Sequence, residues 1–507
     1  MIVRHYDWLA HHANCTPGKT AWIDLHSERS FTYAEANRRC ERLAGHLQNE
    51  CNVARGDRVG VLAMNSTDIM EIQSACAKFG AIFLPLNWRL TVAELDFIIK
   101  DADPKVLIHD LAFADEANAL KSSTGVQHYI ETSGGGGDTA YENAITAAGP
   151  VAAVDDLSHD DVWTIMYTSG TTGLPKGAMN TYGMGFYNAV NLGTPARVTP
   201  DSVTLTILPL FHTGGLNCYT SIALHTGGTS LIMRAFEPGE VLRLIGDPDR
   251  GVTHFFGVPA NYLFMSQHPE FPTTDFSRLV CAGIGGAPTP VPVLETYGKV
   301  GIALQQGYGM TETSPAVLVQ DATMAISKPG STGKPALHNQ VRVVDENGEE
   351  AGIGETGELW VKGPNITPGY WNRPDATAEA ITDGWLHTGD ACRVDDDGHY
   401  YIVDRWKDMY ISGGENVYPA EIESVLFKLE GVADVAVIGL PDERWGEMGC
   451  AVVVVAPGKS LEAEGVIDYC RDKLARFKIP AQVVFVDELP RNATGKVLKR
   501  ILKEEID

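Results

Sequence analysis

Short apolar runs alternate with longer amphipathic stretches in the first part of the chain. Residues 57–64 and 81–87 are apolar runs of strand length, and residues 68–81 repeat their apolar positions at helical spacing. Residues 91–103 open with a threonine that is followed three positions later by a glutamate, which predicts a capped helix. This alternation is typical of mostly parallel sheets that are covered by helices. We therefore expect an α/β fold.

The pattern changes twice further along. Beyond residue 200 we expect five strands, at residues 203–208, 228–233, 252–256, 279–283 and 302–306. Glycine-rich turns and strand-like segments then predict a β-rich subdomain, and a small α/β unit follows. The predicted architecture is a large N-terminal domain of parallel αβ sheets over residues 1–403, with the β-rich subdomain at about 330–403. A small α+β C-terminal domain covers residues 404–507.

Two glycine-rich segments carry no predicted chemistry. The four consecutive glycines at 134–137 predict a mobile surface loop. The sequence GGTS at 227–230 mimics a carrier-protein phosphopantetheine site, but it continues into an apolar strand. We interpret it as a turn and a strand.

Composition and charge restrict the class of protein. The 507 residues are 44% hydrophobic and 21% charged, as in an ordinary globular protein. A net charge of −25 argues against a nucleic-acid partner, although a local basic cluster can still bind a small anion. Nine cysteines with no paired spacing suit reduced thiols. There is no apolar run of membrane-span length and no signal-peptide core, so we expect a cytoplasmic protein without a membrane span.

The stretch at 167–179, YTSGTTGLPKGAM, is the strongest candidate for chemistry. Hydroxyls from Ser169, Thr171 and Thr172 lie between glycines, and Lys176 adds a positive charge. Glycine lets backbone N–H groups converge on an anion, so a loop of this kind after a strand at 162–167 suits phosphate. The Walker P-loop does not fit, because the second glycine of that pattern is replaced by proline and no Ser or Thr follows the lysine. An ordinary surface turn is the alternative.

This stretch, together with five others, resembles the adenylate-forming superfamily of acyl-CoA synthetases, aryl-CoA ligases, adenylation domains and luciferases. The others include GGAP at 285–288, QGYGMTE at 306–312, WLHTGD at 385–390 and PRNATGKVLKR at 490–500. The resemblance covers roughly residues 10–503. It implies ATP, CoA and Mg2+ as cofactors and a small C-terminal domain that is mobile between two poses.

The resemblance also implies where the nucleotide would bind. Adenine would lie between the backbone at Gly286 and Ala287 and the ring of Tyr308, while Thr311 would touch the α-phosphate. Glu312 would hold Mg2+ together with Thr172, because a hard cation prefers oxygen ligands. The implied ATP-binding residues are Thr168, Ser169, Gly170, Thr171, Thr172, Gly173, Lys176, Gly286, Ala287, Pro288, Gln306, Gly307, Tyr308, Gly309, Thr311, Asp390, Ile402, Arg405 and Lys496.

The same resemblance assigns the remaining site residues. Asp390 would accept the ribose hydroxyls, and Lys496 would be the catalytic lysine between carboxylate and α-phosphate. A hinge would lie at residues 406–408, where Trp406 departs from the aliphatic residue that is commoner in the family. Gly413, Gly414 and Glu415 would line the CoA tunnel. The acyl pocket would include Phe211, His212, Gly214, Gly215 and Gly283, with His212 near the carboxylate and the paired glycines leaving space.

These residues predict an ATP-dependent carboxylic acid–CoA ligase that forms acyl-CoA, AMP and pyrophosphate through an acyl-adenylate. The sequence motifs resemble those of bacterial feruloyl/coumaroyl-CoA and fatty acyl-CoA ligases. We therefore expect a hydrophobic aryl-alkenoic acid as the substrate, with a medium- or long-chain fatty acid as the alternative. Loading of a carrier protein, a luciferase-like oxygenase and a non-catalytic nucleotide-binding regulator remain rival functions. For the oligomeric state, a homodimer is the default expectation.

Overall fold

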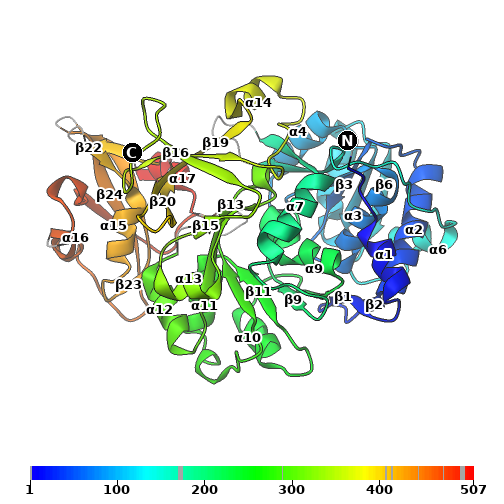
Figure 1. Ribbon diagram of the computed structural model, residues 1–507, viewed down its shortest axis with the longest axis horizontal. Coiled ribbons are helices and arrows are strands. Elements are labelled where there is room, and N and C mark those ends of the chain that lie inside the picture. Colours follow the sequence, from blue (N-terminus) through cyan, green and yellow to red (C-terminus); the bar gives the residue numbers. More distant parts are fainter. Residues whose placement is uncertain are drawn as a thin grey trace.

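The computed structural model describes residues 3–168, 175–287, 289–405, 408–412, 415–442, 445–471, 473–491 and 497–506. For residues 404, 405, 415 and 416 the description covers the main chain only. Figure 1 shows the C-terminal unit, in orange and red, at one end of an elongated molecule, and the N-terminal sheet, in blue and cyan, at the other.

The first sheet contains the alternating pattern of the N-terminal part. In spatial order its strands are β6 (His128–Thr132), β5 (Val106–Asp110), β3 (Arg58–Leu62), β4 (Ile82–Pro85), β7 (Val162–Thr168) and β8 (Lys176–Thr181). All neighbours are parallel except β7 and β8, which form an antiparallel hairpin. The helices α3 (Thr67–Phe79), α4 (Val92–Ala102), α5 (Ala114–Ser123) and α6 (Ala140–Ala147) lie on this sheet, and α2 (Tyr33–Asn49) packs on α3 and α6.

Local sequence explains where these helices begin and end. The side chain of Thr91 accepts from the N–H of Glu94 while Glu94 bonds back to Thr91, so the predicted cap of α4 is confirmed. Helix α3 ends at Gly80, whose φ of 80° is left-handed and favours glycine. Almost every residue of α3 is buried, because the helix lies between the first sheet and α2.

The second sheet has nine strands. Their spatial order is β15 (Lys334–Pro335), β14 (Ala316–Val319), β13 (Leu304–Gly309), β12 (Cys281–Ile284), β11 (His254–Gly257), β9 (Val203–Thr206), β10 (Thr229–Ile232), β1 (Thr20–Asp24) and β2 (Ser30–Thr32). The six strands from β13 to β1 are parallel. Helices on this part are α1 (Trp8–Cys15), α7 (Tyr182–Gly193), α9 (Ser221–Thr226), α10 (Pro238–Gly246), α11 (Pro259–Gln267), α12 (Val291–Lys299) and α13 (Ala322–Ser327). All five strands predicted beyond residue 200 are present.

Two smaller units complete the chain, and all their strand pairs are antiparallel except β24 with β25 in the C-terminal sheet. The predicted β-rich subdomain consists of β16 (Gln340–Val344), β17 (Gly357–Lys362), β18 (Ile381–Thr382), β19 (Trp385–Val394) and β20 (Tyr400–Arg405), with α14 (Pro374–Ala380) beside it. The C-terminal sheet consists of β21 (Tyr410–Ser412), β22 (Glu415–Val417), β23 (Val432–Asp442), β24 (Gly446–Val455) and β25 (Gln482–Val486), with α15 (Pro419–Leu426), α16 (Ala463–Arg471) and α17 (Lys499–Ile506). The predicted fold class, parallel αβ sheets with a smaller C-terminal domain, is confirmed.

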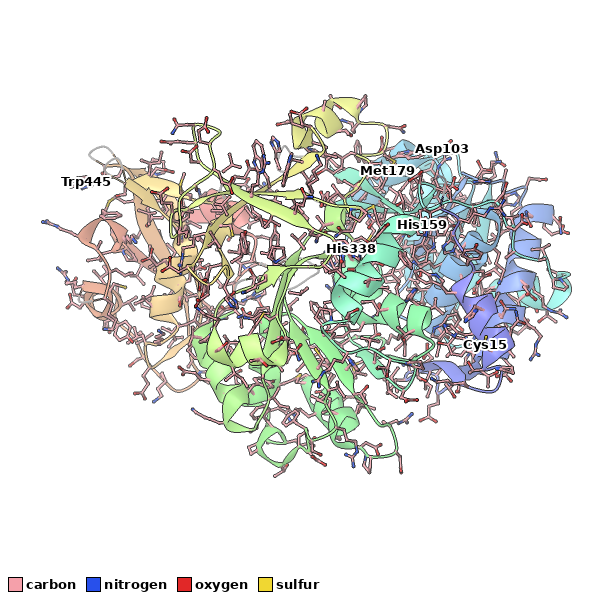
Figure 2. All side chains as sticks on the ribbon, viewed as in Figure 1. Cys15, Asp103, His159, Met179, His338 and Trp445 are labelled. Atoms are coloured by element: carbon pink, nitrogen blue, oxygen red, sulfur yellow. The ribbon has the colours of Figure 1, made fainter. Side chains whose placement is uncertain are left out.

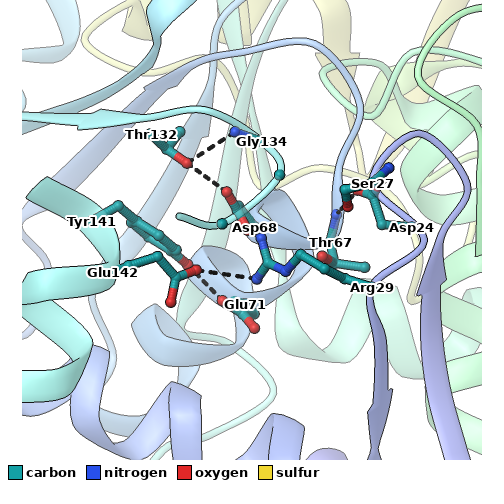
Figure 3. A network of polar contacts seen from close by, with 12 residues as sticks. Asp24, Ser27, Arg29, Thr67, Asp68, Glu71, Thr132, Gly134, Tyr141 and Glu142 are labelled. Atoms are coloured by element: carbon teal, nitrogen blue, oxygen red, sulfur yellow. Dashed lines mark hydrogen bonds and ion pairs between the residues drawn. The ribbon is translucent and has the colours of Figure 1, made fainter. Parts of the chain in front are cut away.

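A network of buried charges ties the N-terminal helices together (Figure 3). Arg39 of α2 donates to Glu71 of α3 and to Glu142 of α6, and the hydroxyl of Tyr141 donates to Glu71 at 2.9 Å. Arg29 pairs with Asp68 at 3.1 Å and with Glu142 at 3.1 Å. Every charge in this network has an opposite charge or a donor against it, as burial of ions requires.

The two glycine-rich segments have different outcomes. GGTS is a turn and a strand as predicted, since Gly227 ends α9 with a left-handed φ of 83° and β10 follows. The prediction of a mobile surface loop at 134–137 is wrong for its first residue. Gly134 is buried, and its N–H donates to the hydroxyl of Thr132 at 3.1 Å. A Cβ there would lie 2.5 Å from a guanidinium nitrogen of Arg234, so the missing side chain allows close packing.

Among the residues that the structure describes, no helix combines the length and apolarity that crossing a bilayer demands.

Candidate functional site

The loop at 169–174 joins two antiparallel strands. The Cα of Thr168, at the end of β7, is paired with that of Lys176, at the start of β8. The predicted strand before the loop is therefore present, and Lys176 is the first residue of the strand that follows the loop. A second strand rather than a helix follows, which separates this loop from a P-loop, where phosphate lies at a helix N-terminus. Ser169, Gly170, Thr171, Thr172 and Gly173 lie outside the described residues.

Thr311 and Glu312 follow the end of β13 in a short helical turn, Thr311–Thr313, and are both buried. The backbone carbonyl of Thr311 accepts from the Asn180 side chain of β8 at 3.2 Å. That of Glu312 accepts from the Thr367 N–H at 2.8 Å. The turn that holds these two predicted residues is therefore attached to the same hairpin that carries Lys176.

Tyr370 links Glu312 to Lys176 and was not predicted. Its hydroxyl donates to Glu312 Oε1 at 2.8 Å, and Lys176 Nζ lies 5.2 Å from the centre of its ring. Burial and the neighbouring Glu312 carboxylate raise the pKa of Tyr370, so the hydroxyl stays protonated and donates. Tyr370 lies in GPNITPGYW at 363–371, a glycine- and proline-rich stretch that suggests only a turn. No local signal in the sequence could have identified it.

Tyr308 and Asp390 meet at a second point of the candidate site. The Tyr308 hydroxyl of β13 donates to Asp390 Oδ2 of β19 at 2.6 Å. Burial first, and the Asp390 carboxylate second, raise the pKa of Tyr308 well above its usual value. Ile402 of β20 packs in the hydrophobic cluster that the Tyr308 ring contacts. The Cα of Arg405 pairs with that of Asp390 across β19 and β20, so these two predicted residues are neighbours in the sheet.

The two predicted adenine walls occupy the carboxyl ends of adjacent strands. Gly286 and Ala287 follow β12, while β13 carries Gln306, Gly307, Tyr308 and Gly309. The strands are parallel, with Ile284 paired to Gln306. Carboxyl ends of parallel strands are where open α/β sheets bind ligands. Gly286 has a φ of 82°, which favours glycine, and Pro288 lies outside the described residues.

His212 begins the helical segment that follows β9, and it is neutral. Its Nδ1 accepts from the N–H of Gly214 at 3.0 Å, so the proton of the neutral ring is on Nε2. Burial lowers the pKa of His212 to about 4. At neutral pH the imidazole therefore presents a neutral N–H donor, and it contributes no positive charge.

Asn65 holds the loop that leads to His212. Its amide donates to the carbonyls of Leu208 at 2.9 Å and Met233 at 3.2 Å, and its Oδ1 accepts from the Leu210 N–H at 2.8 Å. Asn65 is buried and precedes α3, in the first sheet's part of the molecule. It therefore links the two sheets and fixes the loop at 208–212, called the acyl loop here because it carries the predicted acyl-pocket residues Phe211 and His212. The sequence pattern did not reveal Asn65.

The glycines of the predicted acyl pocket have packing roles that we did not expect. A Cβ on Gly215 would lie 2.2 Å from the Pro209 carbonyl oxygen, so this glycine allows close approach of helix and loop. A Cβ on Gly283 would lie 2.3 Å from the Tyr219 hydroxyl, which bonds to the Cys281 thiol at 3.1 Å. The space beside Gly283 is therefore filled by Tyr219. The expected open space at Gly215 is thus replaced by backbone contact.

Aromatic side chains lie next to the acyl loop. Phe211 is buried, with its ring centre 6.4 Å from that of Trp88 and in an edge-to-face arrangement. The Trp88 ring stacks with Phe113 at 5.7 Å. The three rings come from separate segments of the chain and form one aromatic cluster.

The remaining predicted residues belong to the C-terminal part. Gly413, Gly414 and Lys496, with the hinge residues Trp406 and Lys407, lie outside the described residues. Glu415 begins β22, where the structure describes its main chain.

Comparison with known proteins identifies the family. Residues 9–371 match the family described as AMP-binding enzyme, and residues 421–496 match the AMP-binding enzyme C-terminal domain. The chain belongs to the AMP-binding enzyme family. The predicted membership of the adenylate-forming superfamily is therefore confirmed.

Curated relatives cover nearly the whole of this family member. A feruloyl-CoA synthase from an Amycolatopsis species is 42% identical over 498 residues, which are 97% of each chain. An indoleacetate–CoA ligase of Aromatoleum aromaticum is 38% identical and covers 97% of this chain and 96% of its own. A long-chain-fatty-acid–CoA ligase of Mycobacterium tuberculosis is 37% identical over 99% of each chain. All three are CoA ligases or synthases, which confirms the predicted class of acid–thiol ligase.

Solved structures share the fold of the whole chain. ATP-bound MatB from Rhodopseudomonas palustris superposes with a TM-score of 0.90 at 33% identity, covering 98% of both chains. The o-succinylbenzoate CoA synthetase of Bacillus subtilis, in complex with its acyl-adenylate intermediate, has a TM-score of 0.87 at 32% identity and covers 99% of both chains.

Proposed function

We propose that this family member is an ATP-dependent carboxylic acid–CoA ligase that works through an acyl-adenylate. A carboxylate oxygen of the acid attacks the α-phosphorus of ATP, which forms the acyl-adenylate and breaks the bond to pyrophosphate. The CoA thiolate then attacks the acyl carbon, forming the thioester and releasing AMP. One observation carries the proposal: the convergence of Lys176 and Glu312 on Tyr370. It supports a phosphate-binding cation and a metal-binding carboxylate in one site.

The described residues of the candidate site fit the proposed roles in nucleotide binding. Lys176 would neutralise phosphate charge, and Thr311 would contact the α-phosphate. Asp390 would accept the ribose hydroxyls while Tyr308, anchored to it, would offer its ring to adenine. Gly286 and Ala287 would form the opposite wall, with thin backbone that allows close approach.

The protein side chains fit Mg2+ only if phosphate oxygens of ATP supply the other ligands. Among described residues, no group of three or more histidine, cysteine or acidic side chains is suited to a metal ion. Mg2+ in nucleotide sites is commonly held by one or two carboxylates plus phosphate oxygens, and buried Glu312 supplies such a carboxylate. When bound, the cation would offset charge on the phosphates. Its other proposed protein ligand, Thr172, lies outside the described residues.

His212 would bind the acid as a neutral donor. Because Nδ1 is occupied by the Gly214 N–H, only Nε2–H can point at a carboxylate oxygen. A neutral donor would orient the carboxylate without neutralising it, so the nucleophile keeps its negative charge. The cation for the reacting oxygens would be Lys496, in the role that the family resemblance implies.

We propose a hydrophobic aryl-alkenoic acid, of the feruloyl or coumaroyl kind, as the substrate. Two relatives named for aromatic acids, a feruloyl-CoA synthase and an indoleacetate–CoA ligase, support this choice. The aromatic cluster of Trp88 and Phe211, next to His212, would offer flat rings to a planar substrate. The fatty acyl ligase relative supports a long-chain acid as the alternative. Comparing kcat/KM for ferulate, coumarate, indoleacetate and palmitate would decide between them, and a preference for palmitate would overturn the aryl assignment.

Division at about residue 404 into a large and a small mobile domain is part of the proposal. Lys496 would serve adenylation in one pose, and Gly413 and Gly414 would admit the thiol in the other. Two assays test this: acid-dependent pyrophosphate release, and acyl-CoA formation from supplied acyl-adenylate. Lys496→Ala should lower the first by roughly 10²–10³-fold and spare the second. Gly414→Leu should do the reverse, and Lys407→Pro should stop cycling between the halves because proline fixes φ.

The same assays separate the proposal from its rivals. A non-catalytic regulator would bind ATP without releasing pyrophosphate in response to any acid. A carrier-loading enzyme would form adenylate but leave CoA unused. Equal loss of both half-reactions in Lys496→Ala would mean one fixed site instead of two poses.

A further inference from the structure

Tyr370 connects the two charged groups of the proposed phosphate site. Its hydroxyl donates to Glu312 Oε1 at 2.8 Å, and the Lys176 ammonium lies 5.2 Å from its ring centre. The carboxylate therefore lies at the edge of the ring, by the hydroxyl. The ammonium lies over the ring, in the position of a cation–π contact.

Main-chain contacts hold Tyr370 in this position. Its backbone forms a bridge with Ala178 of β8. The residues on either side of Tyr370 form hydrogen bonds with the same strand. The Met179 N–H donates to the Gly369 carbonyl at 3.1 Å, and the Trp371 N–H donates to the Gly177 carbonyl at 2.8 Å. The segment runs antiparallel beside β8, whose residue Met179 is labelled in Figure 2.

Thr367 attaches the same segment to Glu312 itself. Its N–H donates to the Glu312 carbonyl at 2.8 Å, while its hydroxyl donates to the Met179 carbonyl at 2.7 Å. The segment 367–371 thus fastens the turn of Glu312 to the hairpin of Lys176. A displacement of Tyr370 would move both charged groups.

We propose that Tyr370 is a positioning residue that orients the Glu312 carboxylate toward a divalent cation bound with the phosphates of ATP. The proposal rests on the function proposed above for Glu312 and Lys176. A carboxylate that accepts a hydrogen bond on one oxygen is restricted in rotation, and partners of this kind typically change metal affinity by 10–100-fold. The ring also places the Lys176 ammonium beside the phosphates.

Two substitutions separate the hydroxyl from the ring. Tyr370→Phe removes only the bond to Glu312 and keeps the ring below Lys176. Tyr370→Leu removes both contacts. The matched control is Tyr141→Phe, which removes a 2.9 Å bond from a buried tyrosine to buried Glu71 in the remote N-terminal network.

Metal binding can be measured without turnover. Electron paramagnetic resonance counts free Mn2+ in the presence of the full-length protein and α,β-methylene ATP, an analogue that cannot release pyrophosphate. We expect Tyr370→Phe to weaken Mn2+ binding by about 10-fold. Tyr141→Phe should lower the unfolding midpoint and leave Mn2+ binding unchanged. Tyr370→Leu should weaken Mn2+ binding equally and also weaken binding of the analogue at saturating Mn2+.

A double variant makes the assignment to Glu312 specific. Glu312→Gln should itself weaken Mn2+ binding, and adding Tyr370→Phe should then have no further effect. Unchanged Mn2+ binding in Tyr370→Phe, with the wild type active, would overturn the positioning role. Equal further weakening in the Glu312→Gln background would overturn it as well. A wild type without acid-dependent pyrophosphate release would instead disprove the proposed function, and the two failures are thereby distinguished.

Discussion

The hydroxyl of Tyr308 donates a hydrogen bond of 2.6 Å to the carboxylate of Asp390, across two different sheets. The bond gives Asp390 a structural partner besides the ribose that we propose for it. Loss of either member should therefore affect stability as well as nucleotide binding.

Asp390→Ala should weaken ATP binding by about 2–4 kcal/mol, because ribose donors lose a charged acceptor. It should also lower the free energy of unfolding by about 1–3 kcal/mol, since the half-buried Tyr308 hydroxyl loses its charged acceptor. Calorimetry and urea denaturation measure the two effects. Tyr308→Phe in the Asp390→Ala background should restore part of the stability and none of the ATP affinity. Unchanged ATP affinity in Asp390→Ala would remove this residue from the site.

Thr172→Ala combined with Lys176→Ala should raise the KM for ATP at least about 10-fold with little change in the unfolding midpoint. Both residues are proposed to serve the phosphates, and Lys176 contributes a cation–π contact of at most about 1 kcal/mol to the fold. Lys121→Ala is the control, because its ammonium also lies over a tyrosine ring, that of Tyr129 at 5.5 Å. A fall in the midpoint that parallels the loss of activity would indicate an ordinary structural turn.

His212 should make the protein less stable as pH falls from about 6.5 to 4. Burial lowers its pKa to about 4, so the unfolded chain binds a proton in this range that the folded chain does not. The stabilisation is complete above pH 6.5, and its loss amounts to about 3 kcal/mol. In His212→Gln the free energy of unfolding should therefore fall less between pH 7.5 and 4.5. The acid limb of the kcat/KM profile between pH 7 and 5 should be the same in both proteins. A limb that disappears in the variant would mean that His212 titrates near neutrality.

Arg39→Met should destabilise the fold by about 3–5 kcal/mol, because it leaves the buried carboxylate of Glu71 without its guanidinium. Lys100→Met, which breaks the exposed 2.7 Å pair with Asp96, should cost less than about 1 kcal/mol. Urea denaturation compares the two. Similar losses in both variants would contradict the buried character of the N-terminal network.

Asp68 gives this network the opposite pH dependence to His212. Burial raises its pKa to about 6, with Glu71 adding to the rise and Arg29 opposing it. Its contribution to stability is therefore complete below about pH 4 and is lost as pH rises through 6. Asp68→Asn, measured by urea denaturation at pH 5 and 7.5, should remove that decline. An unchanged decline would show that another group titrates there.

Much of the architecture could be predicted from local pattern. Apolar runs of strand length, helical spacing in α3 and the Thr91–Glu94 cap each act within a few residues, so they identify elements without knowledge of the fold. The alternation of these elements then restricts the topology to parallel sheets. The motifs around Lys176, Tyr308 and Glu312 likewise could be recognised because each is a contiguous stretch.

Contacts between distant stretches were decided by the tertiary structure alone. Tyr370 meets Glu312 across 58 residues, and Tyr308 meets Asp390 across 82, so no local period records either pair. The same holds for Asn65, which bonds to a loop that lies 143 residues away in sequence.

The surroundings of the glycines could not be predicted from the sequence for a different physical reason. The sequence alone shows that a side chain is missing, while the structure shows what occupies its place: the Pro209 carbonyl at Gly215 and the Tyr219 hydroxyl at Gly283. The buried start of the loop at 134–137 has the same origin, since Arg234 comes from another sheet to pack against Gly134. The sequence by itself determined the elements and the family of the site. The packing of separate sheets decided which side chains meet, because close contact depends on the three-dimensional position of the whole chain.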